Sequence, residues 1–137
     1  MSHDVAFLLS NPPTLAPPAG YSHVATVNSG RLVFISGQVA LDATGNVVGK
    51  DDFRAQVRQV FEKLRAALDA AGASFRDVIK LNSYVVDTAG LPHFRAVRDE
   101  YVNTANPPAS TAVQVGRLFR PEFLVEVEAI AIVLPSP

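Results

Sequence analysis

The 137-residue chain contains no cysteine, and it has few histidines. Without cysteine it can form no disulfide, no thiolate metal site and no cysteine nucleophile. His3, His23 and His93 are scattered and lack the short spacing of metal ligands. We therefore expect no metal centre, and we interpret the histidines as surface or capping residues.

The chain also lacks an excess of charge of either sign and any long apolar run. Its 12 basic and 13 acidic side chains nearly balance, which gives no electrostatic footprint for nucleic acid or an acidic membrane surface. No apolar stretch approaches the roughly 18 residues that a membrane span needs. The short apolar run at residues 6–9 follows Asp4 rather than a basic region. We expect a soluble, cytoplasmic protein with no nucleic-acid or membrane partner.

The length predicts one domain, residues 1–137, with a core of its own. Residues 1–20 contain two proline pairs and end in Gly20, which predicts an extended arm without regular structure. β-formers at residues 22–27 and 31–38 flank a short Asn-Ser-Gly loop, which predicts a hairpin. Its second strand is apolar on both faces at residues 32–35, so we expect a central strand covered on both sides.

The clearest helix is predicted over residues 52–71, where apolar side chains recur at intervals of 3 and 4 and charged ones take the other side. Asp51 is the expected N-cap and Gly72 the expected left-handed stop. Ser74 and Asp77 have the spacing of a capping box. A strand is predicted over residues 78–86.

A second helix is predicted over residues 92–102, with proline in its first turn and an apolar stripe. Arg98 lies at the margin of that stripe and has two open interpretations, pointing outward or reaching over an edge. After Pro107 and Pro108 we expect a strand, a turn at residues 120–122 and a return strand.

The return strand places two carboxylates among aliphatic side chains. Alternation puts Glu126 and Glu128 on one face together with Leu124, Ile130 and Ile132. The pattern predicts an α+β fold in which two helices cover one face of a mixed sheet. Because no third helix is left for the other face, we also predict a homo-oligomer.

The residues by themselves leave the chemistry open. Glu126 and Glu128 are either an acid and base or ordinary polar residues of a wet strand; burial would raise the pKa of either into a useful range. Ser36 and Gly37 offer backbone donors at a strand end or simply form a turn. Ser110 and its neighbour Thr111 bind an anion or merely border the sheet. The sequence contains no catalytic-triad order, phosphate loop or dinucleotide fingerprint.

Several blocks in one order resemble the RidA (YjgF) family of enamine and imine deaminases, also labelled the L-PSP endoribonuclease family. These blocks are Gly20-Tyr21 and residues 34–38, 56–72, 78–80, 107–109 and 125–131. The resemblance implies a chorismate-mutase-like fold and a homotrimer whose sheets line a central barrel, with ligand clefts at the subunit boundaries. Such a trimer would cover the open sheet face.

The resemblance also implies an activity: hydrolysis of reactive imines, such as 2-iminobutanoate and 2-iminopropanoate, to 2-oxo acids and ammonia, with no metal or organic cofactor. The family's water-activating glutamate matches Glu126. Its pocket tyrosine matches Tyr21 and its strand-end serine matches Ser36, with backbone groups near Gly37 shaping the same pocket.

One departure from the family pattern concerns substrate charge. The family's deaminases carry an arginine directly after the Pro-Ala pair, where this chain has Ser110, and Ala112 stands in place of a cysteine. Replacing a guanidinium fork by a hydroxyl costs on the order of 2 to 5 kcal/mol in anion binding. Arg98, which falls where the family often has a pocket asparagine, is a hypothetical substitute.

Three functions follow, in decreasing order of support. The first is a RidA-type hydrolase whose substrate is not the standard 2-imino acid. The second is a trimer of the same fold that binds a small metabolite without turnover, which the loss of the arginine favours. The third is an endoribonuclease, against which the balanced charge and the lack of a histidine pair argue.

Overall fold

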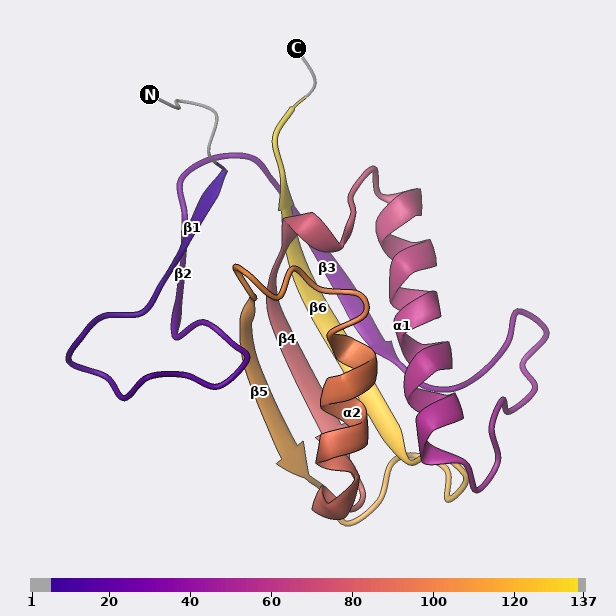
Figure 1. Ribbon diagram of the computed structural model, residues 1–137. Helices are drawn as coiled ribbons and strands as arrows, with labels where there is room; N and C mark the ends of the chain where they lie inside the picture. Colours follow the sequence, from indigo (N-terminus) through magenta and orange to yellow (C-terminus); the bar gives the residue numbers. More distant parts are fainter. Residues whose placement is uncertain (1–5, 136–137) are drawn as a thin grey trace.

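The structure is a computed structural model that describes residues 6–135, so His3 and the first part of the predicted arm lie outside the described residues. Figure 1 shows the arrangement of its helices and strands. The strands are β1 (Phe7–Ser10), β2 (Val24–Val27), β3 (Arg31–Gln38), β4 (Val78–Val85), β5 (Ala109–Gln114) and β6 (Val125–Val133). The helices are α1 (Phe53–Ala70) and α2 (Leu91–Arg98), with short 3-10 turns η1 (Phe75–Asp77) and η2 (Thr88–Gly90).

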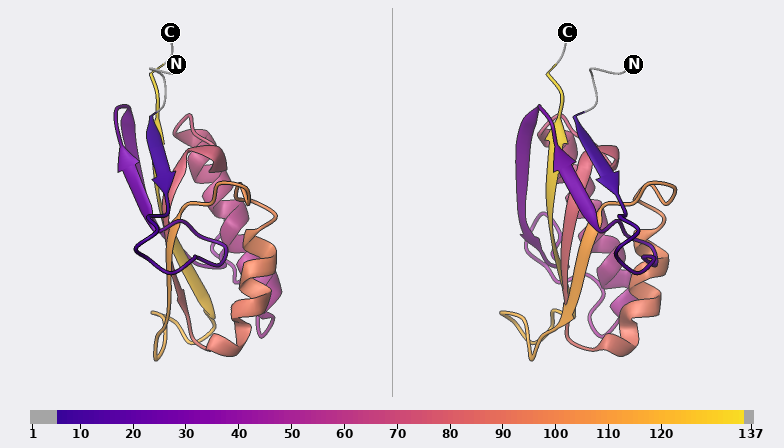
Figure 2. Two further views of the ribbon diagram at one scale, coloured as in Figure 1. Left: turned by 60° about the vertical axis from the view of Figure 1, so that its left-hand side comes forward. Right: turned by 90° about the vertical axis from the view of Figure 1, so that its left-hand side faces the viewer.

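Four strands form the main sheet in the order β3-β6-β4-β5. β6 runs antiparallel to both neighbours, whereas β4 and β5 are parallel and are connected through α2. Both helices lie on one face of this sheet (Figures 1 and 2). The predicted α+β architecture, a mixed sheet with two helices on one face, is confirmed.

Helix α1 forms where the 3.6-residue period predicts it. Its N-cap is Asp52, whose side chain accepts a hydrogen bond from the Ala55 amide at 3.1 Å. The predicted cap, Asp51, is wrong by one residue: Asp51 lies outside the helix with a positive φ of 60°. Gly72, at φ 76°, provides the left-handed stop after the helix.

The other local signals give a similar result. Ser74 and Asp77 form the predicted capping box, which opens η1. β4 corresponds to the predicted strand at residues 78–86. α2 ends at Arg98, four residues before the predicted end, and Tyr101 follows in the next turn.

The core lies between the helices and the sheet. Its largest members are fully buried side chains of α1, α2 and β4, among them Phe61, Leu64, Leu68, Leu81 and Phe94. Alternate residues of β6 complete it from the sheet side: Val125, Val127, Ala129 and Ala131. Burying one large aliphatic or aromatic side chain contributes about 1.5 to 3 kcal/mol, so this layer dominates the stability of the chain.

The predicted hairpin between residues 22–27 and 31–38 is wrong. β2 pairs with β1 in a separate two-stranded ribbon, in which Phe7 lies opposite Val27. The same pairing overturns the expectation that no regular structure precedes residue 20. The Asn28 and Ser29 amides donate to the Ala6 carbonyl, so these residues extend the pairing of β1 with β2 and do not form a hairpin turn between β2 and β3.

β3 is also not the central, doubly covered strand that its apolar run predicts. It lies at the sheet edge, with Leu32 51% and Phe34 72% exposed. β5 and β6, predicted as a strand and its return, do not pair, because β4 lies between them. The ribbon covers only one end of the second sheet face, where Ala6 packs on Ile79 and Ile132. We call this second face the open face.

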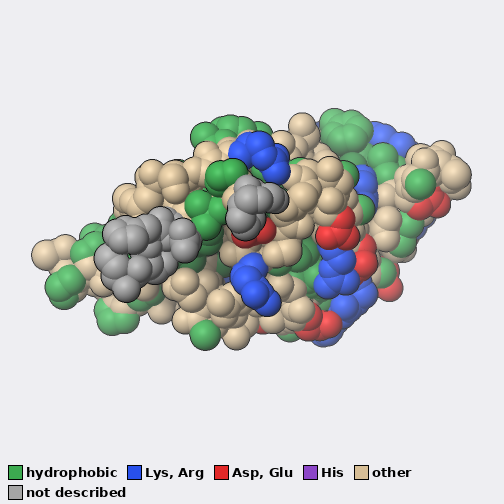
Figure 3. All heavy atoms as spheres, turned by 90° about the horizontal axis from the view of Figure 1, so that it is seen from above, with side chains coloured by type: hydrophobic (Ala, Val, Ile, Leu, Met, Phe, Trp, Pro, Cys, Tyr) green, Lys and Arg blue, Asp and Glu red, His purple; other side chains and the backbone are tan. Residues whose placement is uncertain are grey.

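The surface carries charges of both signs. Figure 3 shows acidic and basic side chains close to each other on one end of the molecule, with hydrophobic side chains between them. No helix within residues 6–135 is both long and apolar enough to cross a membrane.

Candidate active site

Glu126 and Glu128 lie on the open face of β6, as the alternation predicts. Both are half-buried, whereas their neighbours Val125, Val127 and Ala129 are buried beneath the helices. The partners of the two glutamates across the strand pair are Tyr84 and Asn82, respectively, on β4. The two carboxylates therefore belong to a polar row on a face that also exposes large apolar side chains.

A β-bulge in β3 brings the predicted Ser36 and Gly37 to the same place. Ile35 pairs with Ala129 and Gln38 with Val127, so Ser36 and Gly37 together occupy the interval opposite one residue of β6. A methyl group built on Gly37 would overlap the Glu126 carboxylate. Only glycine permits this close approach. The bulge therefore places the Glu126 side chain directly against the Gly37 backbone.

Glu128 is held by two donors that the sequence interpretation missed. The Tyr84 hydroxyl donates to Glu128 Oε1 at 2.9 Å, and Asn82 Nδ2 donates to the same atom at 3.1 Å. Strand alternation on β4 does place Asn82 and Tyr84 on one face. Their contact with Glu128 follows from the pairing of β4 with β6, which was not predicted from the sequence.

The two glutamates differ in their surroundings. Burial raises the pKa of Glu126 above its ordinary value, and the nearby charge of Glu128 adds to this rise. The hydrogen bond to Glu128, followed by burial, raises the pKa of the Tyr84 hydroxyl, so Tyr84 remains a donor. Glu128 thus accepts from two donors, whereas burial and the charge of Glu128 favour the protonated form of Glu126.

A shallow hollow on the open face adjoins this row. It is lined by Phe34, Ile35, Ser36, Asn82, Glu128, Ala129 and Ile130. Its walls are apolar and its polar groups converge from three strands, an arrangement typical of small-molecule sites. Ser36 of the predicted site lines it directly.

The other predicted site residues gather at the β5 edge. Ser22 forms a bridge with Ala109 and donates from its amide to the Pro108 carbonyl at 3.1 Å. This bridge attaches the arm to β5 and fixes Tyr21 beside it. The Tyr21 ring meets His23 edge-on, with centroids 5.2 Å apart.

Arg98 is buried beneath the arm, with only 7% of its surface exposed. Its Nε and Nη2 lie 3.0 and 2.9 Å from Asp99 Oδ1. A side chain on Gly20, which has φ 78°, would come within 2.8 Å of Arg98 Nη2. Of the two open interpretations, Arg98 therefore reaches over the edge toward the arm, with an acidic partner already in place.

Ser110 and Thr111 point to opposite faces of β5. Ser110 pairs with Leu81, a core residue beneath the helices. Thr111 lies on the open face, where Lys80 Nζ donates to its hydroxyl at 2.9 Å. β4 separates β5 from β6 by two strand spacings, about 10 Å. One chain therefore does not bring Ser110 together with Glu126.

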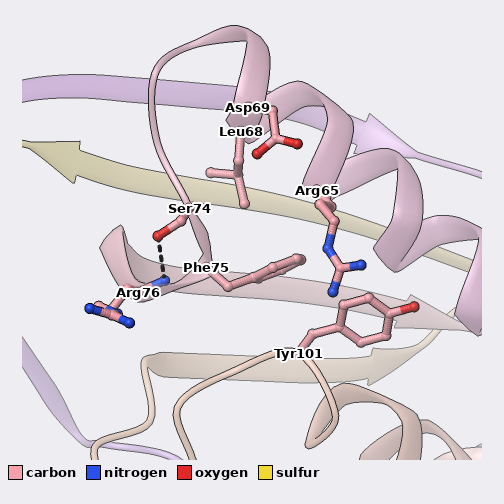
Figure 4. A pocket seen from close by; sticks show the side chains of 7 residues that line it. All are labelled: Arg65, Leu68, Asp69, Ser74, Phe75, Arg76 and Tyr101. Atoms are coloured by element: carbon pink, nitrogen blue, oxygen red, sulfur yellow. Dashed lines mark hydrogen bonds between the residues drawn. The ribbon is translucent and has the colours of Figure 1, made fainter.

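A second hollow lies on the helical side, between α1, η1 and Tyr101 (Figure 4). Arg65 stacks over the Tyr101 ring at 4.8 Å, and Phe75 and Leu68 form the apolar wall. None of the predicted site residues lines it. As for metals, residues 6–135 contain no group of three histidine, aspartate or glutamate side chains arranged to hold an ion.

The fold and the half-buried glutamate pair define a class of small α+β domains with a polar site on an open sheet face. The family described as "Endoribonuclease L-PSP" matches residues 12–133. The chain belongs to this family, which includes the RidA, YjgF and RutC proteins.

Individual relatives agree with this assignment. The 3-aminoacrylate deaminase RutC of Acinetobacter baylyi is 33% identical over 131 residues, covering 96% of this chain and 98% of the relative. The 2-iminobutanoate/2-iminopropanoate deaminase of Salmonella typhimurium is 33% identical, covering 85% and 91%. A crystal structure of a Rid-family protein of unknown function from Yersinia pestis superposes with a TM-score of 0.87 at 38% identity, covering 94% and 100%.

Proposed function

We propose that this protein is a RidA-type hydrolase of reactive imines or enamines, with Glu126 as the group that handles water. The observation that carries the proposal is the Glu126 carboxyl, half-buried against Gly37 with a raised pKa. A carboxyl of this kind exchanges protons closer to neutral pH than an exposed glutamate does. Two relatives that are named as deaminases of an enamine and of imines support the reaction class.

The reaction needs one proton acceptor and one polarised nitrogen. Water adds through its oxygen to the carbon of the C=N bond while Glu126 accepts its proton. That proton passes from Glu126 to nitrogen and gives a carbinolamine. Glu126 then takes the proton of the carbinolamine hydroxyl and passes it to the same nitrogen as the C–N bond breaks, so the products are a carbonyl compound and ammonia. Ser36 and the backbone at Gly37 would hold the substrate beside Glu126.

The complete site would form between copies of the chain, in a homotrimer. The predicted site residues fall into two half-sites. The first contains Glu126 on β6 and Ser36 on β3, at the open face. The second contains Ser110 on β5 and Arg98 on α2, on the helical side, with Tyr21 of the arm beside β5. The exposed Leu32 and Phe34 provide an apolar surface that assembly would bury. A neighbouring copy would then bring its second half-site, with Tyr21, Ser110 and Arg98, to the half-site that contains Glu126.

The substrate would differ from the standard 2-imino acid. Ser110 contributes one neutral hydroxyl where an arginine would hold a carboxylate. Arg98 is already paired with Asp99, so a substrate carboxylate would have to compete with a neighbouring side chain. The site therefore favours an uncharged imine or enamine.

The same observations support one alternative, a small-metabolite-binding trimer without turnover. Loss of a charged clamp removes binding energy that a catalyst would use in the transition state. In this case the pocket would retain its ligand, and Glu126 would serve as a hydrogen-bonding group.

The test is release of ammonia from freshly generated imines, one carrying a carboxylate (2-iminobutanoate) and one uncharged. The wild-type protein is expected to prefer the uncharged imine, and Glu126→Gln to lose activity by about 100-fold or more. Glu100→Gln, which changes an exposed ion pair with Arg58, is the matched control and should keep full activity.

Ser110→Arg tests substrate charge in the same assay and is expected to increase activity toward 2-iminobutanoate. Retention of full activity in Glu126→Gln would eliminate the proposed role of Glu126. Tight binding of a metabolite with no ammonia from either imine would favour the alternative.

A further inference from the structure

Gln56 of α1 is a fully buried polar side chain whose hydrogen bonds converge on the start of β6. Its Nε2 donates to the Glu122 carbonyl at 2.8 Å and to the Gly49 carbonyl at 3.1 Å. Its Oε1 accepts from the Leu124 amide at 2.9 Å. Both amide hydrogens are used, and the side chain joins a loop, a helix and a strand entry.

The position of these bonds matters because β3 ends early. The last residue pair between β3 and β6 is Gln38 with Val127, so Glu126 and the residues before it have no partner on β3. On the other side, Val125 still pairs with Val85 of β4. Where β3 provides no partner, the Gln56 carboxamide forms hydrogen bonds with the Glu122 carbonyl and the Leu124 amide.

The loop before β6 adds to the need for such an anchor. Residues 115–124 connect β5 to β6 without regular strand or helix, and Phe119 in this loop is 67% exposed. Glu126 follows Leu124 by two residues. A shift of the strand entry would therefore move the Glu126 carboxylate away from Gly37.

We propose that Gln56 is a positioning residue, which sets where the Glu126 carboxylate lies against Gly37 by fixing the backbone at Glu122 and Leu124. It touches neither the substrate nor the reacting atoms. Its catalytic consequence rests on the proposed function, but its effect on Glu126 does not.

The first test therefore needs no substrate. The side chain of Glu126 is observed by carbon-13 NMR during a pH titration of wild type, Gln56→Met and Val57→Ala. Val57 is the next residue of α1, fully buried in the main core. Gln56→Met is expected to shift the Glu126 signal and to lower its titration midpoint toward that of an exposed glutamate, because the carboxylate leaves its buried contact. Val57→Ala should lose stability and leave that midpoint unchanged.

A second measurement uses imine hydrolysis. Gln56→Met is expected to lower kcat by on the order of tenfold to 100-fold with a smaller change in KM, since a misplaced catalytic group affects the reaction step most. If the wild type hydrolyses no imine, the proposed function fails, and the titration still decides the role of Gln56.

Gln56→Asn serves if Gln56→Met does not fold. It keeps the carboxamide but shortens the side chain by one bond, about 1.5 Å. The same displacement of the Glu126 signal, smaller in size, is expected. A Glu126 titration in either variant that matches wild type and Val57→Ala would overturn the proposal and leave Gln56 with a structural role alone.

Discussion

The two faces of the sheet use the same strands for different purposes. The face beneath the helices is apolar and closed: Phe61 and Leu64 of α1 pack there on Leu81 and Val127 with no exposed surface. The open face carries Glu126 and the row that holds Glu128, beside exposed aromatic and aliphatic side chains. On β6 the two sets alternate residue by residue.

This difference shows how one strand can contribute both to the core and to a polar surface. The buried residues of β6 hold the strand in place, so the glutamates between them gain a rigid support. The open face, in turn, keeps the two carboxylates close to each other in a partly buried setting, where burial and the charge of Glu128 raise the pKa of Glu126. Changes on the two faces should therefore have different consequences.

The largest effect is expected on the closed face. Phe61→Ala removes a ring that stacks against Tyr101 at 5.2 Å and contacts Phe94 at 5.8 Å. We expect the free energy of unfolding, measured by urea denaturation, to fall by about 3 to 5 kcal/mol. Phe119→Ala, at an exposed position, is the control and should cost less than about 0.5 kcal/mol. An equal fall in unfolding free energy in Phe61→Ala and Phe119→Ala would show that the closed face does not dominate stability.

The next effect is expected where β3 meets Glu126. In Gly37→Ala the new methyl group displaces the Glu126 carboxylate, at an expected cost of about 1 to 3 kcal/mol in unfolding free energy. Glu126→Ala removes the obstacle, so the double variant should recover most of the loss. A double-mutant cycle measures this coupling, and simple additivity would show that the contact is unimportant.

A smaller effect on the single chain is expected at Phe34. Because Phe34 is 72% exposed, Phe34→Ser should change the unfolding free energy of the dissociated chain by less than about 0.5 kcal/mol. It should nevertheless weaken assembly, which sedimentation velocity over a range of concentrations measures. Wild-type assembly in this variant would show that the open face is not the interface.

The smallest effect is a pH dependence of stability. Burial, followed by the charge of Glu128, raises the pKa of Glu126 in the folded protein, so the protonated form is favoured there. Its contribution to stability is present below the ordinary pKa of glutamate and is lost as pH rises through the raised value. Glu126→Gln should therefore gain stability relative to wild type at pH 8 but not at pH 4. Urea denaturation of both proteins measures this. The same difference in unfolding free energy between Glu126→Gln and wild type at pH 4 and pH 8 would contradict the prediction.

Local patterns predicted much of this molecule. The apolar period of α1, the Gly72 stop, the Ser74 and Asp77 capping box and the alternation on β6 each depend on neighbours close in sequence. The resemblance identified the family, and it singled out Glu126, Ser36 and Gly37, which the structure brings together. Asn82 and Tyr84 were missed because their importance depends on which strand lies next to β4.

The larger errors were errors of pairing, whereas the misplaced cap of α1 and the early end of α2 were errors of a few residues at helix ends. Residues 22–27 have the composition of a strand, and they form one, yet β2 pairs with β1. Residues 32–35 are apolar on both faces, yet β3 is an edge strand, and Leu32 and Phe34 remain exposed on the open face. Composition determines that a segment needs burial, and it leaves open what provides it.

The sequence by itself determined the type of each main element, the two helices on one face and the alternation that sets Glu126 and Glu128 apart from the core. These follow from local backbone preferences and from the periods of helix and strand. Only the tertiary structure decided the strand order, the bulge at Ser36 and Gly37 and the burial of Arg98 beneath the arm at Gly20. These depend on contacts between residues distant in the chain, where packing and hydrogen bonding select one of several partners that local preference permits equally.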